Sequence, residues 1–596
     1  MGNNTLYNRA DLPLEALISE IDTGAIGLPK MQRQFVWKDA KIRDLLDSMI
    51  KGYPIGFVIT WEASNNSKSR QIGQTKHGYN DPSKLIIDGQ QRLTSLYSIV
   101  KGIAVEGSDY KNRTITISFN PFTRCFEVGT PALEKSSDWI YNITDVFQEG
   151  SSYSSSTKFL KRLEESRQKN GETVSDKEKK TINDNITDLL DLKKCLIPTL
   201  DIISAADEED VSNIFVNING SGTKLNESDF ILTLISVHWS DGRDLIEQFC
   251  EDTKKHNSEG RKDIYNPILD FDPADVIRAV MSFGFKRARL KYAYKLLHGA
   301  DFDKKGAVSD ELRAQRFELF KKYLDTTLNR DNFVEFLKCV AAAGYVKKEL
   351  ISSKTNIIFS YTFYLIGKYE YNLSEPELRS VITKAVFVFA LTSRYVGSFE
   401  SQMEQDMDNL PIEKTYSAFK DYFDKMANSS LTDDFFNVTL IGMDGLETTN
   451  NRSPAFLAYI ASQNVLNSKV LFSTPQIPTV TLYNEWATGA RKAVELHHLF
   501  PKAYLKNSLS LKKKQINQVA NYAFIEWAEN MDILDAAPSV YFPPLIANMS
   551  EDEVALMEAE HGLPHGWESL DYFEFLNLRR KNMSEIIKKG YLKISI

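Results

Sequence analysis

The sequence predicts an α+β protein made of several domains, and three observations favour this fold class. At 596 residues the chain is long enough for about three or four domains of ordinary size. Hydrophobic residues make up 42% of the chain and charged residues 26%, as in folded globular proteins. Strand and helix periodicities are mixed near both ends of the chain, whereas the middle is rich in helical periodicity.

The first 240 residues combine the two periodicities, and we expect them to form an α/β domain. Apolar residues at helical spacing follow Asp39 and stop at Gly52, which predicts a helix. The run "IGFVITW" (55–61) is typical of a strand. A second apolar run precedes "DGQQR" (88–92), and a helical pattern follows it. This short motif is therefore expected where a strand leads into a helix.

The "DGQQR" turn has features of a phosphate-binding site. A turn that enters a helix exposes N–H groups and the positive end of the helix dipole. Gly89 allows the backbone to come close to a ligand, and Arg92 can add a charge-assisted hydrogen bond. The alternative is that Asp88 only caps the helix and pairs with Arg92 at the surface.

A helical middle domain is expected over residues 241–440. Upstream of it, residues 150–185 are rich in serine and then densely charged, which indicates an inserted segment or an exposed helix. The apolar run at 385–392 is too short to span a bilayer, and the N-terminus lacks the apolar core of a signal peptide. We therefore expect a cytoplasmic protein that does not associate with membranes.

The net charge and the cysteine positions limit how the chain can bind nucleic acid or a metal ion. With a net charge of −8, any basic surface for nucleic acid must be local. One basic segment is "FKRARLKYAYK" (285–295), and a second holds Lys502, Lys506, Lys512, Lys513 and Lys514. Either segment is also explained as the solvated face of a helix. The four cysteines form no CxxC pair, so a metal would need His, Asn or carboxylate ligands.

The stretch "AVELHHLFPKAYL" contains two of the chain's eight histidines, His497 and His498. Imidazole can ligate a divalent cation, and with an ordinary pKa of about 6.5 it can also act as a neutral base. Adjacent residues on a strand point to opposite faces, so both rings can serve one site only at a strand end or bend. Asn521 and Asn530 follow, with a short predicted strand between them that can return the chain to the histidines. The alternative is that both histidines are ordinary core or surface residues.

Three N-terminal segments resemble a known family. "KMQRQFVWKDAKIRDLLDSMIKGYPIGFVITW", "IIDGQQRLTSLYSI" and "FVNINGSGTKLNESDF" are similar, in this order, to the ParB/sulfiredoxin-like N-terminal module of GmrSD-type, modification-dependent (type IV) restriction endonucleases. The resemblance covers residues 12 to 240 and implies binding and hydrolysis of a nucleoside triphosphate, which is GTP, ATP or CTP. The implied nucleotide-binding residues are Gln32, Arg33, Asp88, Gly89, Gln90, Gln91, Arg92, Asn219 and Gly222, with Asp88 and Arg92 as catalytic residues.

The C-terminal region, from "ELHHLFPKAYL" to "FLNLRRKNMSEII", resembles the HNH nuclease module of the same family. We expect this ββα-metal fold over residues 441–596. The resemblance implies that His497 and Asn530 bind Mg²⁺ or Mn²⁺, that His498 is the general base and that Asn521 fixes the loop. The third position of the motif is asparagine rather than histidine, which is a common form of it.

The two modules together predict an NTP-dependent DNA endonuclease that nicks or cleaves modified or foreign double-stranded DNA, such as phage DNA, in anti-phage defence. We expect Lys502 and Lys506 to contact this DNA. A double-strand break by a single-site nuclease would favour a homodimer. Two alternatives are a nucleotide-switched DNA sensor with an inactive HNH module, and a toxin-like DNase that ignores modification.

Overall fold

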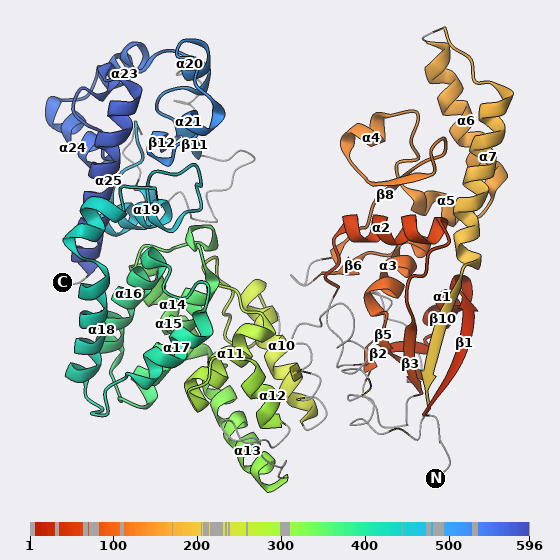
Figure 1. Ribbon diagram of the computed structural model, residues 1–596, viewed down its shortest axis with the longest axis horizontal. Coiled ribbons are helices and arrows are strands. Elements are labelled where there is room, and N and C mark those ends of the chain that lie inside the picture. Colours follow the sequence, from red (N-terminus) through yellow and green to blue (C-terminus); the bar gives the residue numbers. More distant parts are fainter. Residues whose placement is uncertain are drawn as a thin grey trace. The chain divides into compact units, whose positions relative to one another are not determined.

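The computed structural model shows an α+β protein, which confirms the predicted fold class (Figure 1). By contact the chain divides into two compact units, residues 1–245 and 246–596, and each is described by itself. The structure describes residues 6–29, 35–62, 69–70, 83–107, 112–169, 171–203, 206, 214, 231–232, 235, 239–257, 260–297, 310–443, 445–472, 478–480, 494–526 and 535–594.

A mixed sheet forms the centre of the first unit. Its strands are β1 (Tyr7–Pro13), β2 (Ile26–Pro29), β3 (Val58–Glu62), β4 (Ser69–Arg70), β5 (Lys84–Asp88) and β10 (Leu196–Ile202), in the order β1-β10-β3-β5-β2-β4. The pairs β10/β3 and β2/β5 are parallel, and the others are antiparallel. Two short hairpins accompany the sheet, β6 (Val105–Glu106) with β7 (Asn112–Arg113) and β8 (Ile117–Asn120) with β9 (Cys125–Val128).

The central strands are buried on both faces, because their side chains alternate between two apolar clusters. Val58 and Ile86 belong to the main core of the unit, whereas Ile59 and Ile87 belong to a second cluster. The helices of this unit are α1 (Leu14–Asp22), α2 (Asp39–Ile50), α3 (Gln90–Lys101), α4 (Pro131–Lys135), α5 (Ile143–Glu149), α6 (Ser152–Gln168) and α7 (Asp176–Asp191). The helix expected after Asp39 is therefore present, and the charged segment around residues 150–185 is largely helical.

Helices dominate the second unit from its beginning. They are α10 (Ser240–Lys254, which crosses the boundary), α11 (Pro273–Phe285), α12 (Lys291–Leu297), α13 (Asp310–Thr327), α14 (Arg330–Ala342), α15 (Lys354–Tyr369), α16 (Glu375–Thr392), α17 (Phe399–Asp408), α18 (Tyr416–Ser430) and α19 (Pro454–Leu466). The apolar run at 385–392 lies in α16, where Val386, Phe387 and Phe389 are fully buried. Within the described part of the chain, no helix is both long and apolar enough to cross a membrane.

The C-terminal part of this unit contains a two-stranded sheet, β11 (Val494–His498) with β12 (Tyr522–Glu526), and short helices α20 (Lys502–Asn507) and α21 (Lys513–Ile516) between the strands. The helices α23 (Pro538–Ile546), α24 (Glu551–His561) and α25 (Tyr572–Ile594) follow. The long helix α25 lies beside α19 (Figure 1). The two approach closely, since a Cβ atom added to Gly590 would lie 2.6 Å from the Ser462 Cβ. The 440/441 boundary expected between a helical and a nuclease domain falls inside this unit and stays a prediction.

Candidate functional site

The "DGQQR" motif lies at a tight junction between β5 and α3. Asp88 ends the strand, Gly89 has a φ of 89°, and the helix begins at Gln90. A side chain at Gly89 would meet Val58 Cγ2 at 3.1 Å and the Phe57 carbonyl at 3.3 Å. Glycine is therefore required here both by the left-handed backbone and by the close approach of β3.

The Arg92 side chain anchors the chain segment that enters β3. Its guanidinium donates to the carbonyls of Ile55 and Phe57, the latter at 2.7 Å, and to the Asp88 carboxylate at 3.2 Å. Burial lowers the pKa of Arg92, and the charge of Asp88 opposes this shift. A side chain at Gly56 would overlap the guanidinium. Arg92 pairs with Asp88, as one of the two sequence interpretations expects, but it also holds a distant loop.

The Gln91 side chain connects α3 to the segment that follows residues 30–34. Its Oε1 accepts hydrogen bonds from the backbone N–H of Val36 at 2.8 Å and of Trp37 at 3.3 Å. Gln90 and Gln91 are both buried. Both glutamines of the motif thus belong to the interior of the junction, and Gln91 sets the position of a neighbouring loop.

That loop lines an open pocket of about 450 Å³. The pocket is lined by Phe35, Val36, Trp37, Lys38, Asp39, Ala40, Gly107, Arg113 and Val128. Arg113 donates to the Asp39 carboxylate and to the Trp37 carbonyl, and the Lys41 ammonium lies 4.5 Å from the centre of the Trp37 ring. The pocket lining thus combines aromatic rings with Arg113, whose charge is partly balanced by Asp39. Four other predicted nucleotide-binding residues, Gln32, Arg33, Asn219 and Gly222, lie outside the described residues.

The double histidine lies at the end of β11. His498 is the last residue of the strand and is paired with Tyr522, while His497 is paired with Ala523. The His497 ring is 7% exposed and meets the Tyr541 ring edge-on, with centroids 6.4 Å apart. The His498 ring meets Tyr522 instead, at 4.8 Å. The two imidazoles therefore have different surroundings, as expected for adjacent residues of a strand.

The His498 ring is oriented by a side chain that sequence reasoning missed. Its Nε2 lies 3.2 Å from the Oδ1 of Asn517. Burial lowers the pKa of His498, the bond to Asn517 opposes this, and the positive charge of Lys502 adds to the lowering. If Nε2 carries the proton that Asn517 accepts, then Nδ1 has the free lone pair. His498 is thus arranged to accept a proton at Nδ1.

The buried Asn521 side chain connects the turn after β11 to the turn before β12. It is fully buried, Oδ1 accepts from the Phe500 N–H at 2.8 Å, and Nδ2 donates to the carbonyls of Phe500 at 3.1 Å and Ile516 at 3.4 Å. The Leu499 N–H also donates to the Asn521 carbonyl at 2.9 Å. These bonds fix the turn after β11 against the turn before β12. This is the geometry that a loop-fixing asparagine needs.

The two basic segments differ in how their charges are used. In the first, Lys286 forms an ion pair with Glu370, and Arg289 lies 3.8 Å from Glu404. The five lysines at 502, 506, 512, 513 and 514 are exposed, and none forms an ion pair with another described residue. The first segment therefore serves the helical packing in part, whereas the second presents uncompensated charge near His498.

Only one of the two predicted metal ligands, His497, lies among the described residues. No group of three or more His, Cys, Asp or Glu side chains that could hold an ion occurs among them. The second predicted ligand, Asn530, lies outside them. A histidine and an asparagine are chemically compatible with Mn²⁺ or Mg²⁺, because imidazole and amide oxygen both ligate such ions and leave positions for water and phosphate.

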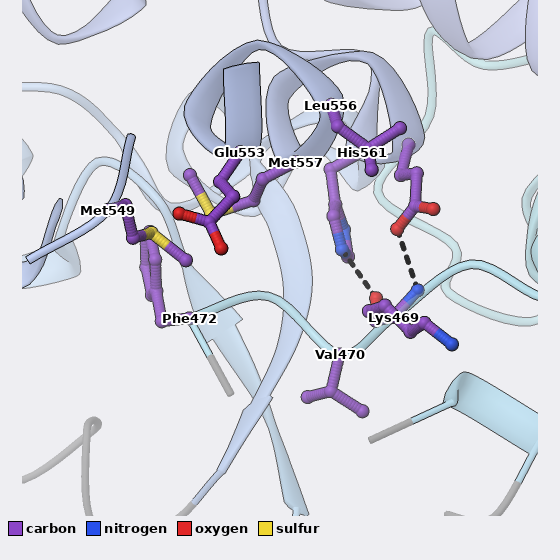
Figure 2. Close-up of a pocket in the computed structure, with 9 residues that line it drawn as sticks. Lys469, Val470, Phe472, Met549, Glu553, Leu556, Met557 and His561 are labelled. Carbon is purple, nitrogen blue, oxygen red and sulfur yellow. Dashed lines mark hydrogen bonds between the residues drawn. The ribbon is translucent and has the colours of Figure 1, made fainter. Parts of the chain in front are cut away.

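The other buried histidine of this unit has a structural role. His561, at the end of α24, donates through Nε2 to the Lys469 carbonyl at 2.9 Å, and Glu560 accepts from the Lys469 N–H at 2.7 Å (Figure 2). The adjoining pocket of about 20 Å³ has room for about one water molecule. Burial lowers the pKa of His561 to about 4. The pair of bonds attaches α24 to the chain before β11.

The comparison with protein families gives a match to most of the first unit. Residues 14–236 match the family model described as the GmrSD restriction endonuclease, N-terminal domain. No curated protein matches the chain. The match covers less than half of the 596 residues and supports a restriction endonuclease. The resemblance to the GmrSD type that the three N-terminal segments predict is confirmed for residues 14–236.

The anchoring role of Arg92 predicts a loss of stability on its removal. Arg92→Ala leaves the carbonyls of Ile55 and Phe57 and the Asp88 carboxylate without this donor, so the free energy of unfolding of the first unit should fall by about 2–3 kcal/mol. Thermal and denaturant unfolding of the full chain measures this. Lys51→Ala, which removes an exposed ion pair, is the control and should change little. An Arg92→Ala protein as stable as the wild type would contradict the anchoring role.

The buried His561 predicts that stability depends on pH. Because its folded pKa lies near 4 and its ordinary value is 6.5, only the unfolded chain binds a proton between these values. Above pH 6.5 the His561 ring is neutral in both the folded and the unfolded chain, and the free energy of unfolding has its full value. It should fall by up to about 3 kcal/mol as the pH drops from 6.5 to 4. Denaturant unfolding at several pH values measures this. His561→Asn should flatten the slope, and Lys589→Ala, at an exposed position of the same unit, should not; equal slopes in all three proteins would contradict the assignment.

Proposed function

We propose that this chain is an NTP-dependent DNA endonuclease that cuts modified or foreign double-stranded DNA at the β11/β12 hairpin. The supporting observation is the position of His498 at the strand end, held by Asn517 beside a group of exposed lysines. His498 acts as the general base. His497 and Asn530 hold Mg²⁺ or Mn²⁺, and Lys502 and Lys506 contact the DNA backbone.

In the proposed reaction His498 Nδ1 is the nitrogen that accepts the proton. A water molecule gives its proton to His498 Nδ1, the resulting hydroxide attacks phosphorus, and the bond from phosphorus to the leaving oxygen breaks. A bound divalent cation supplies charge stabilisation for the phosphate and the leaving oxygen. Asn521 keeps the turn closed while His498 accepts the proton, because its hydrogen bonds to Phe500 fix the residues directly after the histidines.

The first unit binds and hydrolyses GTP, ATP or CTP in this proposal. The junction of β5 and α3 offers a helix N-terminus, and Gln91 joins it to the pocket beside Trp37 and Arg113. The family resemblance adds Gln32, Arg33, Asn219 and Gly222, outside the described residues, to the proposed nucleotide-binding set. Arg92 shapes the junction through Ile55 and Phe57, so its contact with phosphate would require it to share or release one of these bonds.

A second candidate function is a nucleotide-switched DNA sensor whose nuclease module is inactive. It needs no catalytic metal site, and the exposed lysines after His498 favour DNA binding by themselves. This candidate keeps the lysine surface for DNA binding. It predicts nucleotide-dependent binding of DNA without strand cleavage.

A nicking assay on plasmid DNA with Mg²⁺ or Mn²⁺, with and without nucleotide, separates the two candidates. The wild type should nick, and His498→Ala should lose about 10²- to 10⁴-fold in rate, because it removes the base. His565→Ala, which alters an exposed imidazole of the same unit, is the matched control and should nick normally. Full activity in His498→Ala would sink the assignment of the base, and DNA binding without any nicking by the wild type would favour the sensor. Modified and unmodified phage DNA, compared as substrates, test the specificity.

The lysine surface predicts a salt-dependent change in affinity. Replacing Lys502 and Lys506 with alanine removes two phosphate contacts, so the slope of log Kd against log salt should fall by about 2, with little dependence on DNA sequence. Fluorescence anisotropy over a range of salt concentrations measures the slope. Lys581→Ala with Lys589→Ala, at exposed positions of α25, is the matched control. An unchanged slope would mean that the DNA lies elsewhere.

A further inference from the structure

The loop of residues 515–521, which leads into β12, is held from outside by one face of α25. The Tyr572 hydroxyl donates to the carbonyls of Gln515 at 2.9 Å and Ile516 at 3.1 Å. Arg579 Nη1 donates to the Ala520 carbonyl at 2.7 Å. Arg580 Nη2 donates to Gln518 Oε1 at 3.2 Å. Backbone carbonyls at both ends of the loop are therefore bound to a single helix.

We propose that α25 is a positioning element for the base, and that Tyr572 and Arg579 set the orientation of His498 through this loop. The inference rests on the proposed nuclease function. The link is Asn517, which lies between the anchored carbonyls of Ile516 and Ala520 and whose Oδ1 meets His498 Nε2 at 3.2 Å. A shift of the loop would move the partner that orients the imidazole.

The burial of Arg579 supports a positional role rather than a purely stabilising one. Its side chain is fully buried, and it forms no ion pair with a carboxylate of any described residue. Its Nε instead donates to the His561 carbonyl at 3.3 Å, at the C-terminal end of α24, and its guanidinium lies 6.0 Å from the Phe575 ring. A buried cation compensated by dipoles alone costs stability that an apolar residue of similar size would not. An apolar residue, however, cannot hold the Ala520 carbonyl.

The same helix also contacts the helical part of the unit. Ser584 Oγ donates to the Phe436 carbonyl at 2.7 Å, and Lys588 pairs with Asp433 at 2.9 Å. Further along, Gly590 allows the close contact with Ser462 of α19. The helix thus spans from the helical packing to the loop beside His498, and its position determines both.

The test is Tyr572→Phe, which removes one hydroxyl and keeps the ring. In the plasmid assay kcat should fall about 10-fold, because a misplaced base loses rate steeply with distance. KM for DNA should be unchanged, and the unfolding temperature should fall no further than in the control variant, which loses a hydroxyl of the same kind. Tyr361→Phe, which also removes a buried hydroxyl bonded to a carbonyl, at 2.8 Å from Thr327 O, is the matched control and should keep the wild-type kcat. Arg579→Lys should retain more activity than Arg579→Met, since lysine can still donate to Ala520.

A double substitution tests the route through Asn517. In an Asn517→Ala background, Tyr572→Phe should cause no further loss of kcat, because the link is already broken. An equal loss in both backgrounds, wild-type kcat in Tyr572→Phe, or an equal fall in kcat in Tyr361→Phe would each overturn the inference. These results differ from failure of the proposed function itself, in which the wild type would not nick and His498→Ala would change nothing.

Discussion

The arrangement of the C-terminal site depends on the buried amide of Asn521. Its donor and acceptor both meet the main chain of Phe500, so one side chain closes the turn after β11 onto the turn before β12. A buried amide left without partners costs about 1–3 kcal/mol, and the closed turn is thereby strongly preferred over an open one. The direction in which His498 leaves the strand follows from this closure. The lysines of α20, directly after Pro501, are placed by the same turn.

At the junction of β5 and α3, other polar side chains likewise form hydrogen bonds to the backbone of a distant segment. Arg92 satisfies the carbonyls of Ile55 and Phe57, as Asn521 satisfies Phe500, and Gln91 satisfies two N–H groups at Val36 and Trp37. In both units a polar side chain beside the candidate chemistry binds the backbone of a distant segment. Such bonds fix loops without a long-range charge pair, so the position of the site does not depend on ionic strength.

The local features could be predicted from the sequence, and the long-range contacts could not. Periodicity and turn chemistry place the strand end at Asp88, the glycine junction and the helix after Asp39 within a residue or two, because these depend on neighbours in the chain. The partner of Gln91 lies 55 residues away, and the carbonyl bound by Arg579 lies 59 residues away. Only tertiary packing brings these together. A faint signal existed for α25, since Tyr572, Phe575 and Arg579 share a helical face by spacing alone.

Charge shows the same limit and explains how an acidic chain can present a surface for DNA. Composition alone cannot distinguish the segment at 285–295 from the lysines after His498, because Lys286 meets Glu370 from 84 residues away. Between residues 496 and 525 the sequence has no aspartate or glutamate, and the lysines there project into solvent. Screening limits exposed charges to about 10 Å, so a phosphate near His498 experiences this local cluster and not the net charge of −8. Several acidic residues elsewhere form ion pairs within the helical packing, whereas the lysines after His498 form none with a described residue, so this local basic surface does not follow from composition.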